Sequence, residues 1–418
     1  MVRKPETHAY VFARSPESKP VLAGSIKLTH RGGEFNYAAP WLNAPWAYPL
    51  DPINLPLSMQ TYVTTDRKKV FGVFLDAAPD AWGERIQLMS NESSPRNELE
   101  KLIRLSGSGV GIIEFSLSQS RPKTPRALPS AQLLDRLSKA IDQITSNHEL
   151  SGDELQLIEP GSSMGGARPK ITLTDEAGIA WLTKFSRADD IVSYPEIEFA
   201  SMTLLAKVGV RVPQVKLQKI TDGKYCYLIK RFDRVAGTDI HFISANALFN
   251  IDRLRIYEDS RNDPAGYIAL ARILRKVSDA PLEDCIELFK RMVFSILIGG
   301  TDDHARNHAV VFDVTARQWR LSPAYDVLPI VNSQGQQSMG IGLFGRDSTI
   351  QNALSAAADF GIKPAASIGI VKEIVAVLAN WRAHFAAAGV GAGDLVVLSR
   401  IIDGNLDLAK NYLAQRVD

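Results

Sequence analysis

The sequence predicts an α/β protein of the α+β type, in which strands and short helices come first and helices make up most of the last part. Up to about residue 230, short apolar runs alternate with turn-forming residues, which is typical of strands joined by tight connections. Beyond about residue 235, apolar residues recur mostly at helical spacing. A β-hairpin pattern interrupts this helical part between Asn307 and Asp326. These observations favour a mixed fold with more than one domain.

The length and composition are those of a soluble globular protein. The chain has 418 residues, of which 45% are hydrophobic and 22% charged, enough for two or three domains with a large core. Its net charge of +2 gives no electrostatic case for nucleic acid as the main ligand. Cys226 and Cys285 are the only cysteines, no apolar leader follows Met1, and the longest apolar run, 292–298, is too short for a bilayer. We therefore expect a cytoplasmic protein without membrane contact.

The first unit, residues 1–118, is expected to mix strands and helices. Its predicted elements are strands at 9–12 and 21–28, a proline- and aromatic-rich loop at 41–56, and helices at 80–88 and 99–105. A linker over residues 119–149 follows, because 120–129 contains three prolines and three positive charges. A short helix at 131–144 belongs to this linker.

The second and third units are expected to divide at about residue 234. In 150–234, the predicted elements are a Gly/Ser loop at 161–170, hairpin strands at 170–174 and 179–185, a helix from Pro195 to about Val208, and strands at 214–219 and 225–230. The third unit, 235–418, is predicted to be mostly helical, with its most apolar helix at 282–298 and further helices over 353–417.

Three polar residues near the interrupting hairpin point to chemistry. Asp302 and Asn307 have the D-x-x-x-x-N spacing of a protein-kinase catalytic loop. Strands at 308–312 and 318–321 would then return the chain to Asp326, a second acidic residue. A kinase needs this order, because one Asp faces the substrate hydroxyl while an Asn and a second Asp hold magnesium. Taken singly, each of the three could be an ordinary turn residue.

Two further residues lie inside this loop. His304 has no companion ligands at metal-binding spacing, so we expect it to order the loop and not to bind a metal. Asp303 could approach a substrate or be solvated, and both interpretations stay open.

Lys184 and Glu198 form a candidate ion pair. Lys184 ends an otherwise apolar or neutral strand, and Glu198 shares an apolar helical stripe with Met202 and Leu205. A carboxylate on an inward-facing stripe needs a cation, so Lys184 is its predicted partner. Glu196, on a more polar face, is the alternative. A Lys–Glu pair of this kind grips phosphate oxygens in kinases.

Two other segments would surround a nucleotide. The loop from Gly161 to Lys170 offers small residues, backbone N–H groups, hydroxyls and cations, although a flexible turn would look the same. The segment 228–234, at the end of the predicted strand 225–230, has the position of a kinase hinge, where Phe232 could pack on a base. Asp233, between two arginines, is interpreted as part of a structural ion-pair cluster.

With these motifs together, the chain resembles the HipA family of serine/threonine kinase toxins from bacterial toxin–antitoxin modules. The resemblance covers nearly the whole chain. Its motifs are T-D-x-H-A-R-N at 301–307, R-F-D-R at 231–234, Y-D at 325–326, the Ser-containing loop at 162–170, Lys184-Phe185, the helix at 198–209, and the F-x-D-x-A-P-D stretch within 74–83.

The resemblance implies a bilobal protein-kinase-like fold with an N-terminal mixed α/β subdomain and a helical C-terminal lobe. Asp302 would be the catalytic residue, and Asn307 and Asp326 would bind Mg²⁺. The residues implied to form the ATP site are Ser162, Ser163, Met164, Gly165, Gly166, Lys170, Lys184, Glu198, Lys230, Arg231, Phe232, His304 and Asn307. The loop has adjacent serines, and its register to Lys170 favours Ser163 over Ser162 as an autophosphorylated, self-inactivating site.

The resemblance also implies partners. These are a small helix-turn-helix antitoxin of the HipB type, operator DNA reached indirectly through that antitoxin, and a protein substrate such as an aminoacyl-tRNA synthetase. Two other functions remain open at this point: a small-molecule kinase with the same core, and a kinase-like regulator that acts by binding to an antitoxin–DNA complex. The set of Lys184, Asp302, Asn307 and Asp326 favours an active kinase, because a binding module has no need of all four.

Overall fold

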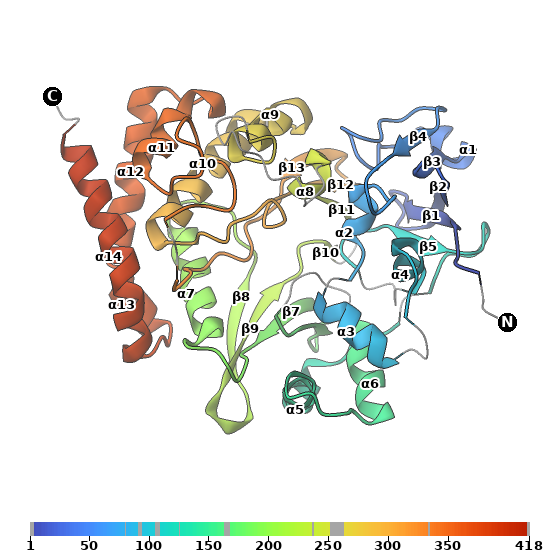
Figure 1. Ribbon diagram of the computed structural model, residues 1–418, viewed down its shortest axis with the longest axis horizontal. Coiled ribbons are helices and arrows are strands. Elements are labelled where there is room, and N and C mark those ends of the chain that lie inside the picture. Colours follow the sequence, from blue (N-terminus) through green and yellow to red (C-terminus); the bar gives the residue numbers. More distant parts are fainter. Residues whose placement is uncertain are drawn as a thin grey trace.

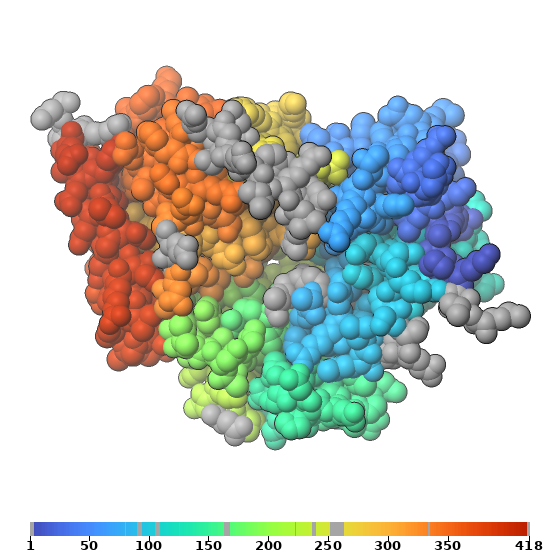
Figure 2. All heavy atoms as spheres, in the orientation of Figure 1, coloured from blue at the N-terminus to red at the C-terminus, as the bar shows by residue number. Residues whose placement is uncertain are grey.

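The computed structural model describes residues 4–79, 81–90, 94–104, 109–124, 126–162, 168–235, 238–250, 263–332 and 335–415. Strands gather in the N-terminal and central parts of the chain, and helices cover the C-terminal part (Figure 1). The predicted mixed fold, with N-terminal sheets and a helical C-terminal part, is confirmed. In the space-filling view, the surface is hollowed near the centre, where the blue, green and orange segments meet (Figure 2).

The N-terminal sheet is antiparallel with the order β4-β3-β2-β1-β5. Its strands are β1 (His8–Arg14), β2 (Pro20–Leu28), β3 (Gly33–Tyr37), β4 (Tyr62–Thr64) and β5 (Glu114–Ser116). The helices of this region are α1 (Ala39–Leu42), α2 (Gly72–Asp76), α3 (Ala81–Ser90) and α4 (Glu98–Arg104). The predicted strands in β1 and β2 and the predicted helices in α3 and α4 are present. The sequence prediction did not include β3, β4, β5, α1 or α2. The strands β4 and β5 have only three residues each, which are too few to show an alternating pattern.

The second sheet has the order β6-β7-β9-β8 and carries the predicted hairpin. Its strands are β6 (Lys170–Thr174), β7 (Ala180–Phe185), β8 (Val215–Lys219) and β9 (Tyr225–Lys230). Helix α7 (Tyr194–Lys207) begins one residue before Pro195, which lies in its first turn. Helices α5 (Leu134–Thr145) and α6 (Gly152–Ile158) lie beside this sheet, and a separate core joins Leu137 and Ile141 of α5 with Trp82 and Ile86 of α3.

The third sheet has the order β10-β11-β12-β13. Its strands are β10 (Arg234–Val235), β11 (Thr238–Ser244), β12 (Ala309–Asp313) and β13 (Gln318–Leu321). The hairpin formed by β12 and β13 was predicted, whereas the expectation of mostly helical structure after residue 235 was wrong for β11. This strand pairs with β12, far along the chain, so local sequence alone gives it little support.

The remaining elements are helices, as the sequence predicted. They are α8 (Ala245–Phe249), α9 (Tyr267–Val277), α10 (Pro281–Ile298), α11 (Ile350–Ser355), α12 (Pro364–Leu378), α13 (Trp381–Ala387) and α14 (Ala392–Ala414). Helix α10 is the central one and packs against α9, α12 and α14. Within the described residues, no individual helix has the length and hydropathy to cross a bilayer, although α12 and α13 meet that test as a bent pair.

Candidate active site

Lys184 joins two carboxylates from different parts of the fold. Its Nζ atom lies 2.6 Å from Oε1 of Glu198 and 2.6 Å from Oδ1 of Asp326. The strand β7 supplies the lysine, helix α7 supplies Glu198, and the segment after β13 supplies Asp326. The predicted pair of Lys184 with Glu198 is therefore present, and Asp326 is a second partner that the sequence did not indicate.

The alternative partner, Glu196, is not the one that Lys184 contacts. Burial raises the pKa of Glu196, and the nearby charge of Asp394 raises it further. No ion pair with a cation involves Glu196 among the described contacts. The apolar stripe along α7 thus selected the correct carboxylate, because it separated the inward face of the helix from the polar one.

The three charges set one another's ionisation. Burial alone would lower the pKa of Lys184, but the charges of Asp326 and Glu198 outweigh burial and hold it above its usual value. Burial raises the pKa of Asp326, yet the cations of Lys184 and Lys170 hold it well below its usual range. Burial raises the pKa of Glu198, the charge of Lys184 opposes this, and the negative charge of Asp326 raises it further. Lys184 is accordingly a cation and Asp326 an anion at neutral pH.

Asp326 remains accessible in spite of this pairing. Its side chain is 41% exposed, whereas those of Lys184 and Glu198 are 13% and 5% exposed. Its backbone has a φ of 60°, in the left-handed region that costs a non-glycine residue on the order of 1 kcal/mol. The surrounding structure holds this conformation, which turns the carboxylate toward Lys184.

Backbone hydrogen bonds shape the loop that carries Asp302. Helix α10 ends at Ile298 and is capped by Gly299, whose φ of 74° is left-handed. A Cβ on Gly299 would lie 2.2 Å from Cγ2 of Ile401. The N–H of Asn307 donates to the carbonyl of His304 at 2.8 Å, and its side-chain amide donates to the carbonyl of Asp302 at 3.5 Å. Asn307 is buried while the neighbouring Asp302 is exposed, so the loop presents Asp302 to solvent.

Asp302 and Asp326 share one electrostatic environment. Partial burial raises the pKa of Asp302, the positive charge of His304 opposes this, and the charges of Asp326 and Asp303 raise it further. A carboxylate with a raised pKa accepts protons more readily, which suits a group that takes a proton from a hydroxyl. The Nδ1 atom of His304 is buried and has no hydrogen-bond partner among the described residues. No group of three or more His, Cys, Asp or Glu suited to a metal was found in the described part of the chain.

Asp303 has a structural role that both sequence interpretations missed. It is buried and not solvated. It accepts hydrogen bonds from the hydroxyls of Tyr267 and Ser295, the latter at 3.2 Å, and lies 3.0 Å from Nε2 of His308. Burial opposes ionisation, but His308 and the hydroxyl of Tyr267 lower the pKa of Asp303. Asp303 therefore attaches the loop of Asp302 to α9 and α10.

Three hydrogen bonds from different parts of the chain hold the segment before Asp326. A guanidinium nitrogen of Arg291 donates to the carbonyl of Ser322, and the N–H of Ala324 donates to the carbonyl of Arg211 at 2.8 Å. The hydroxyl of Tyr325 donates to the carbonyl of Arg306 at 2.8 Å, which ties the segment to the loop of Asp302. These bonds explain how a strained residue is kept in place.

The hinge segment contains the predicted ion-pair cluster. Arg231 donates to both oxygens of Asp233, at 3.0 and 2.6 Å, and Asp233 also accepts from the N–H of Gly111 at 2.8 Å. Arg234 donates to the carbonyl of Gly109 at 2.7 Å. The cluster joins the hinge to the N-terminal region, and the structural interpretation of Asp233 is confirmed.

Part of the hinge backbone is already hydrogen-bonded to neighbouring segments. The N–H of Arg231 donates to the carbonyl of Ala180 at 2.9 Å, and that of Lys230 donates to Gln214 at 2.8 Å. The ring of Phe232 lies 5.8 Å from that of Tyr325, so it is placed beside the residue that precedes Asp326. The side chain of Arg231 is buried in the ion-pair cluster described above, so it is not free to contact a nucleotide.

The Gly/Ser loop is described only at its two ends. Ser163, Met164, Gly165 and Gly166 lie outside the described residues. At the first end, the hydroxyl of Ser162 donates to the carbonyl of Glu159 at 2.8 Å. At the other end, Lys170 begins β6, and its charge contributes to the lowered pKa of Asp326.

Helix α3 of the N-terminal region contacts both ends of this loop. The indole N–H of Trp82 donates to the carbonyl of Lys170 at 2.7 Å. A Cβ on Gly83 would lie 2.5 Å from the carbonyl oxygen of Ser162, so only glycine fits there without a shift. Sequence reasoning noticed the stretch 74–83 but gave it no role. A tryptophan followed by a glycine on a short helix was the available signal.

Comparison with known proteins matches two family models. The model of the HipA-like C-terminal domain matches residues 162–381, and the model of the HipA N-terminal domain matches residues 18–116. The first match contains Lys184, Glu198, Asp302, Asn307 and Asp326.

Individual relatives agree with this assignment. A Sinorhizobium fredii protein named "Putative kinase Y4mE" is 24% identical over 316 residues, which span 71% of this chain and 72% of that protein. A second protein of that organism, "Putative kinase Y4dM", is 28% identical over 165 residues, or 37% of this chain and 38% of its own. Among solved structures, HipA of Shewanella oneidensis MR-1, in complex with HipB and operator DNA, superposes with a TM-score of 0.71 at 14% identity. It covers 96% of this chain and 97% of its own, so the likeness is one of fold.

Proposed function

Because the chain belongs to the HipA family, we propose that it is an ATP-dependent serine/threonine protein kinase that acts as the toxin of a toxin–antitoxin module. The observation that carries the proposal is the double contact of Lys184 with Glu198 and Asp326. It brings a lysine, its orienting glutamate and a second acidic residue together beside the exposed Asp302. Phosphoryl transfer depends on such positioned charges more than on covalent chemistry.

Each residue then has a role set by its position. Lys184, kept charged and oriented by Glu198, would contact phosphate oxygens of ATP. Asp302, exposed and with a raised pKa, would orient the acceptor hydroxyl and take its proton. Phe232, at the hinge, would pack against the adenine.

The residues present fit a magnesium ion. Mg²⁺ prefers oxygen ligands, and the ionised, partly exposed carboxylate of Asp326 together with the side-chain oxygen of Asn307 supplies them. When bound, the ion would neutralise charge on the phosphates. The contact of the Asp326 carboxylate with Lys184 supports this proposal, because it fixes the place of one of the two proposed ligands.

The partners follow from the relatives. A solved relative is complexed with HipB and operator DNA, and we propose a helix-turn-helix antitoxin as the partner here. The net charge of +2 supports indirect contact with DNA through that antitoxin, since binding to phosphates requires an excess of cations. The proposed substrate is a protein of translation such as an aminoacyl-tRNA synthetase, and Ser163 is the proposed site of autophosphorylation and self-inactivation.

Transfer of phosphate and arrest of growth test the proposal together. Asp302→Asn should keep ATP binding but lower phosphoryl transfer by a factor on the order of 10² or more. Asp407→Asn, an exposed change on α14, is the matched control and should transfer phosphate normally. Expression without an antitoxin should slow growth for wild type and Asp407→Asn, and not for Asp302→Asn.

Phosphoproteomics after brief expression would then name the substrate. The wild-type sample should gain phosphopeptides that the Asp302→Asn sample lacks, including one that contains Ser163. Growth arrest by Asp302→Asn equal to that by wild type would overturn the kinase-toxin proposal and favour a binding mechanism. Transfer to small molecules alone would favour a small-molecule kinase.

A further inference from the structure

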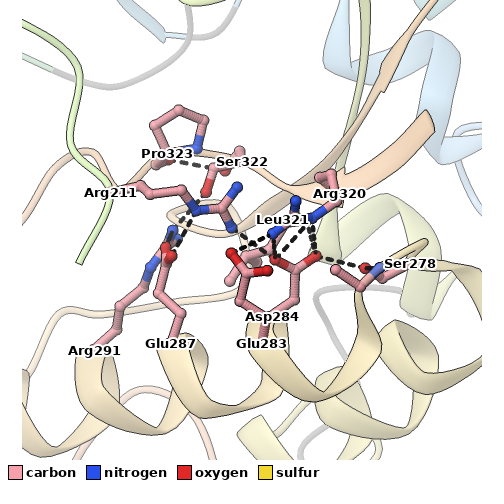
Figure 3. Close-up of polar contacts among 11 residues, drawn as sticks. Arg211, Ser278, Glu283, Asp284, Glu287, Arg291, Arg320, Leu321, Ser322 and Pro323 are labelled. Carbon is pink, nitrogen blue, oxygen red and sulfur yellow. Dashed lines mark hydrogen bonds and ion pairs between the residues drawn. The ribbon is translucent and has the colours of Figure 1, made fainter. Parts of the chain in front are cut away.

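The loop between α7 and β8, residues 208–214, is bonded to the C-terminal part of the chain. The carbonyl of Val208 accepts from Nζ of Lys290 on α10 at 3.0 Å. The carbonyl of Arg211 accepts from the N–H of Ala324 at 2.8 Å. The guanidinium of Arg211 reaches α10 as well, because Nε donates to Glu287 at 2.6 Å and Nη2 donates to Asp284 at 2.7 Å. Figure 3 shows this guanidinium lying between the two carboxylates.

The two carboxylates that receive Arg211 are buried. The side chain of Asp284 is fully buried and that of Glu287 is 7% exposed, whereas Arg211 itself is 35% exposed. Asp284 also accepts from Arg320, from Ser278 and from the N–H of Leu321. Buried carboxylates of this kind are stable only while their hydrogen-bond partners stay in place. Asp284 and Glu287 therefore depend on donors that stay in place. Among these donors, Arg211 is the one that comes from the α7–β8 loop.

Arg211 is bonded to α10 and to the segment that carries Asp326, and it lies shortly after α7 in the chain. It lies four residues after the end of α7, which carries Glu198. Its guanidinium is bonded near the N-terminal end of α10, and the opposite end of that helix leads into the loop of Asp302. Through Ala324 it is bonded to the segment that carries Asp326 in its left-handed conformation. No bond from Arg211 to Lys184 or Asp302 is present among the described contacts, so its influence passes through these elements.

We propose that Arg211 is a positioning residue that fixes Asp326 relative to Glu198 and to the loop of Asp302. The proposal rests on the function proposed above. If the α7–β8 loop loses its hold on α10, Ala324 loses a fixed acceptor and Asp326 moves with respect to Lys184. Displacement of a reacting group by about 1 Å can cost a factor of up to 10² in rate.

Two matched arginine-to-lysine variants separate the positioning effect of Arg211 from the effect of its positive charge. Arg211→Lys keeps the cation but loses the planar fork that reaches two carboxylates at once. Arg320→Lys makes the same change at a second arginine on Asp284, where the N–H of Leu321 still holds the strand end. We expect Arg211→Lys to lower kcat about 10-fold and to raise the magnesium concentration needed for half-maximal ATP binding several-fold. Arg320→Lys should change neither quantity by more than about twofold.

Calorimetric binding of ATP at graded magnesium concentrations gives a readout independent of turnover. In a double-mutant cycle with Glu198→Gln, the losses in magnesium–ATP affinity should be non-additive, because both residues act on the placement of Asp326. Equal effects of the two lysine variants, or additive losses with Glu198→Gln, would overturn the role of Arg211. If wild type itself transfers no phosphate, the proposed function fails, and the binding cycle still decides the positioning role.

Both the kinetic and the calorimetric measurements require that the variants fold. Circular dichroism and urea unfolding should show Arg211→Lys as folded as Arg320→Lys. Should Arg211→Lys be unfolded, the double variant Arg211→Gln with Glu287→Gln takes its place, because it removes the cation together with one of its carboxylates. The same loss of magnesium–ATP affinity is expected from it, and normal affinity would count against the proposal.

Discussion

The Nζ atom of Lys184 lies 2.6 Å from Oδ1 of Asp326, although the two residues are separated by 142 positions in the chain. This contact closes the site between the second sheet and the segment after β13. It also means that the acidic residue proposed to hold magnesium is positioned by the lysine proposed to hold phosphate. A substitution at either residue should therefore disturb the other.

The shared contacts of Lys184 predict non-additive effects. Lys184→Ala and Glu198→Ala should each weaken ATP binding, and the double variant should be little worse than Lys184→Ala, because Glu198 acts by holding the lysine. Calorimetric affinities of the four proteins measure this coupling. Glu196→Ala, on the same helix, is the control and should have a smaller effect. Fully additive losses would show that Lys184 and Glu198 act separately.

The second prediction concerns magnesium. Asn307→Ala and Asp326→Ala should each reduce ATP affinity more strongly with magnesium than in EDTA, because the lost oxygen ligands matter only when the ion is present. Asp326→Ala should also release Lys184 from one of its two carboxylates. Equal losses under both conditions would assign the two residues a purely structural role.

Local patterns in the sequence predicted those parts of the site that depend on local structure. The helical stripe of α7 identified Glu198, and the spacing from Asp302 to Asn307 identified the loop. The burial of Asp303 could not be predicted in this way, because its partners Tyr267 and Ser295 reach it only through packing of α9 and α10. A polar residue in an apparent loop looks exposed until the helices beneath it are known.

The same limit applies to contacts between the N-terminal region and the rest. β11 was missed because its pairing partner is distant, and with it the bond between Asp76 and Ser244. The N-terminal stretch 74–83 was recognised by resemblance, but its physical role became visible only from its neighbours. Asp76 and Trp82 give two predictions about that role.

The raised pKa of Asp76 predicts that the stability of the fold depends on pH. The carboxylate of Asp76 accepts from the N–H and the hydroxyl of Ser244, at 2.7 and 2.6 Å, and burial raises its pKa to about 6. Because the pKa of Asp76 is raised on folding, its protonated form favours the folded state. Its contribution to the free energy of unfolding is full below the unfolded pKa of about 4 and is lost as the pH rises through about 6. The size of this change is on the order of 2 to 3 kcal/mol.

Asp76→Asn isolates this contribution from other titrating groups. An asparagine keeps an acceptor for Ser244 and carries no charge at any pH. The free energy of unfolding of the variant should therefore rise relative to wild type between pH 4.5 and pH 7.5, as urea titrations at both values would measure. Parallel pH profiles for the two proteins would show that Asp76 has an ordinary pKa.

The hydrogen bond of Trp82 to Lys170 predicts that the N-terminal region affects the affinity for ATP. The indole N–H of Trp82 donates to the carbonyl of Lys170 at the end of the Gly/Ser loop. Trp82→Phe keeps most of the apolar contact but removes this donor, and one hydrogen bond is worth about 0.5 to 1.5 kcal/mol. If the bond fixes the loop for ATP, its loss should raise the KM for ATP by a factor of about 2 to 10. The kcat should change little, because Asp302 and Asp326 are untouched.

Trp41→Phe is the matched control for this change. The indole of Trp41 is also buried, and its N–H donates to the carbonyl of Tyr48 at 3.0 Å, within the N-terminal region and away from the loop. Both substitutions remove one indole–carbonyl bond, so both should reduce the stability to urea by a similar amount. Only Trp82→Phe should raise the KM for ATP, since only its carbonyl partner belongs to the loop. Equal KM values for the two variants would mean that α3 supports the fold without influencing the nucleotide.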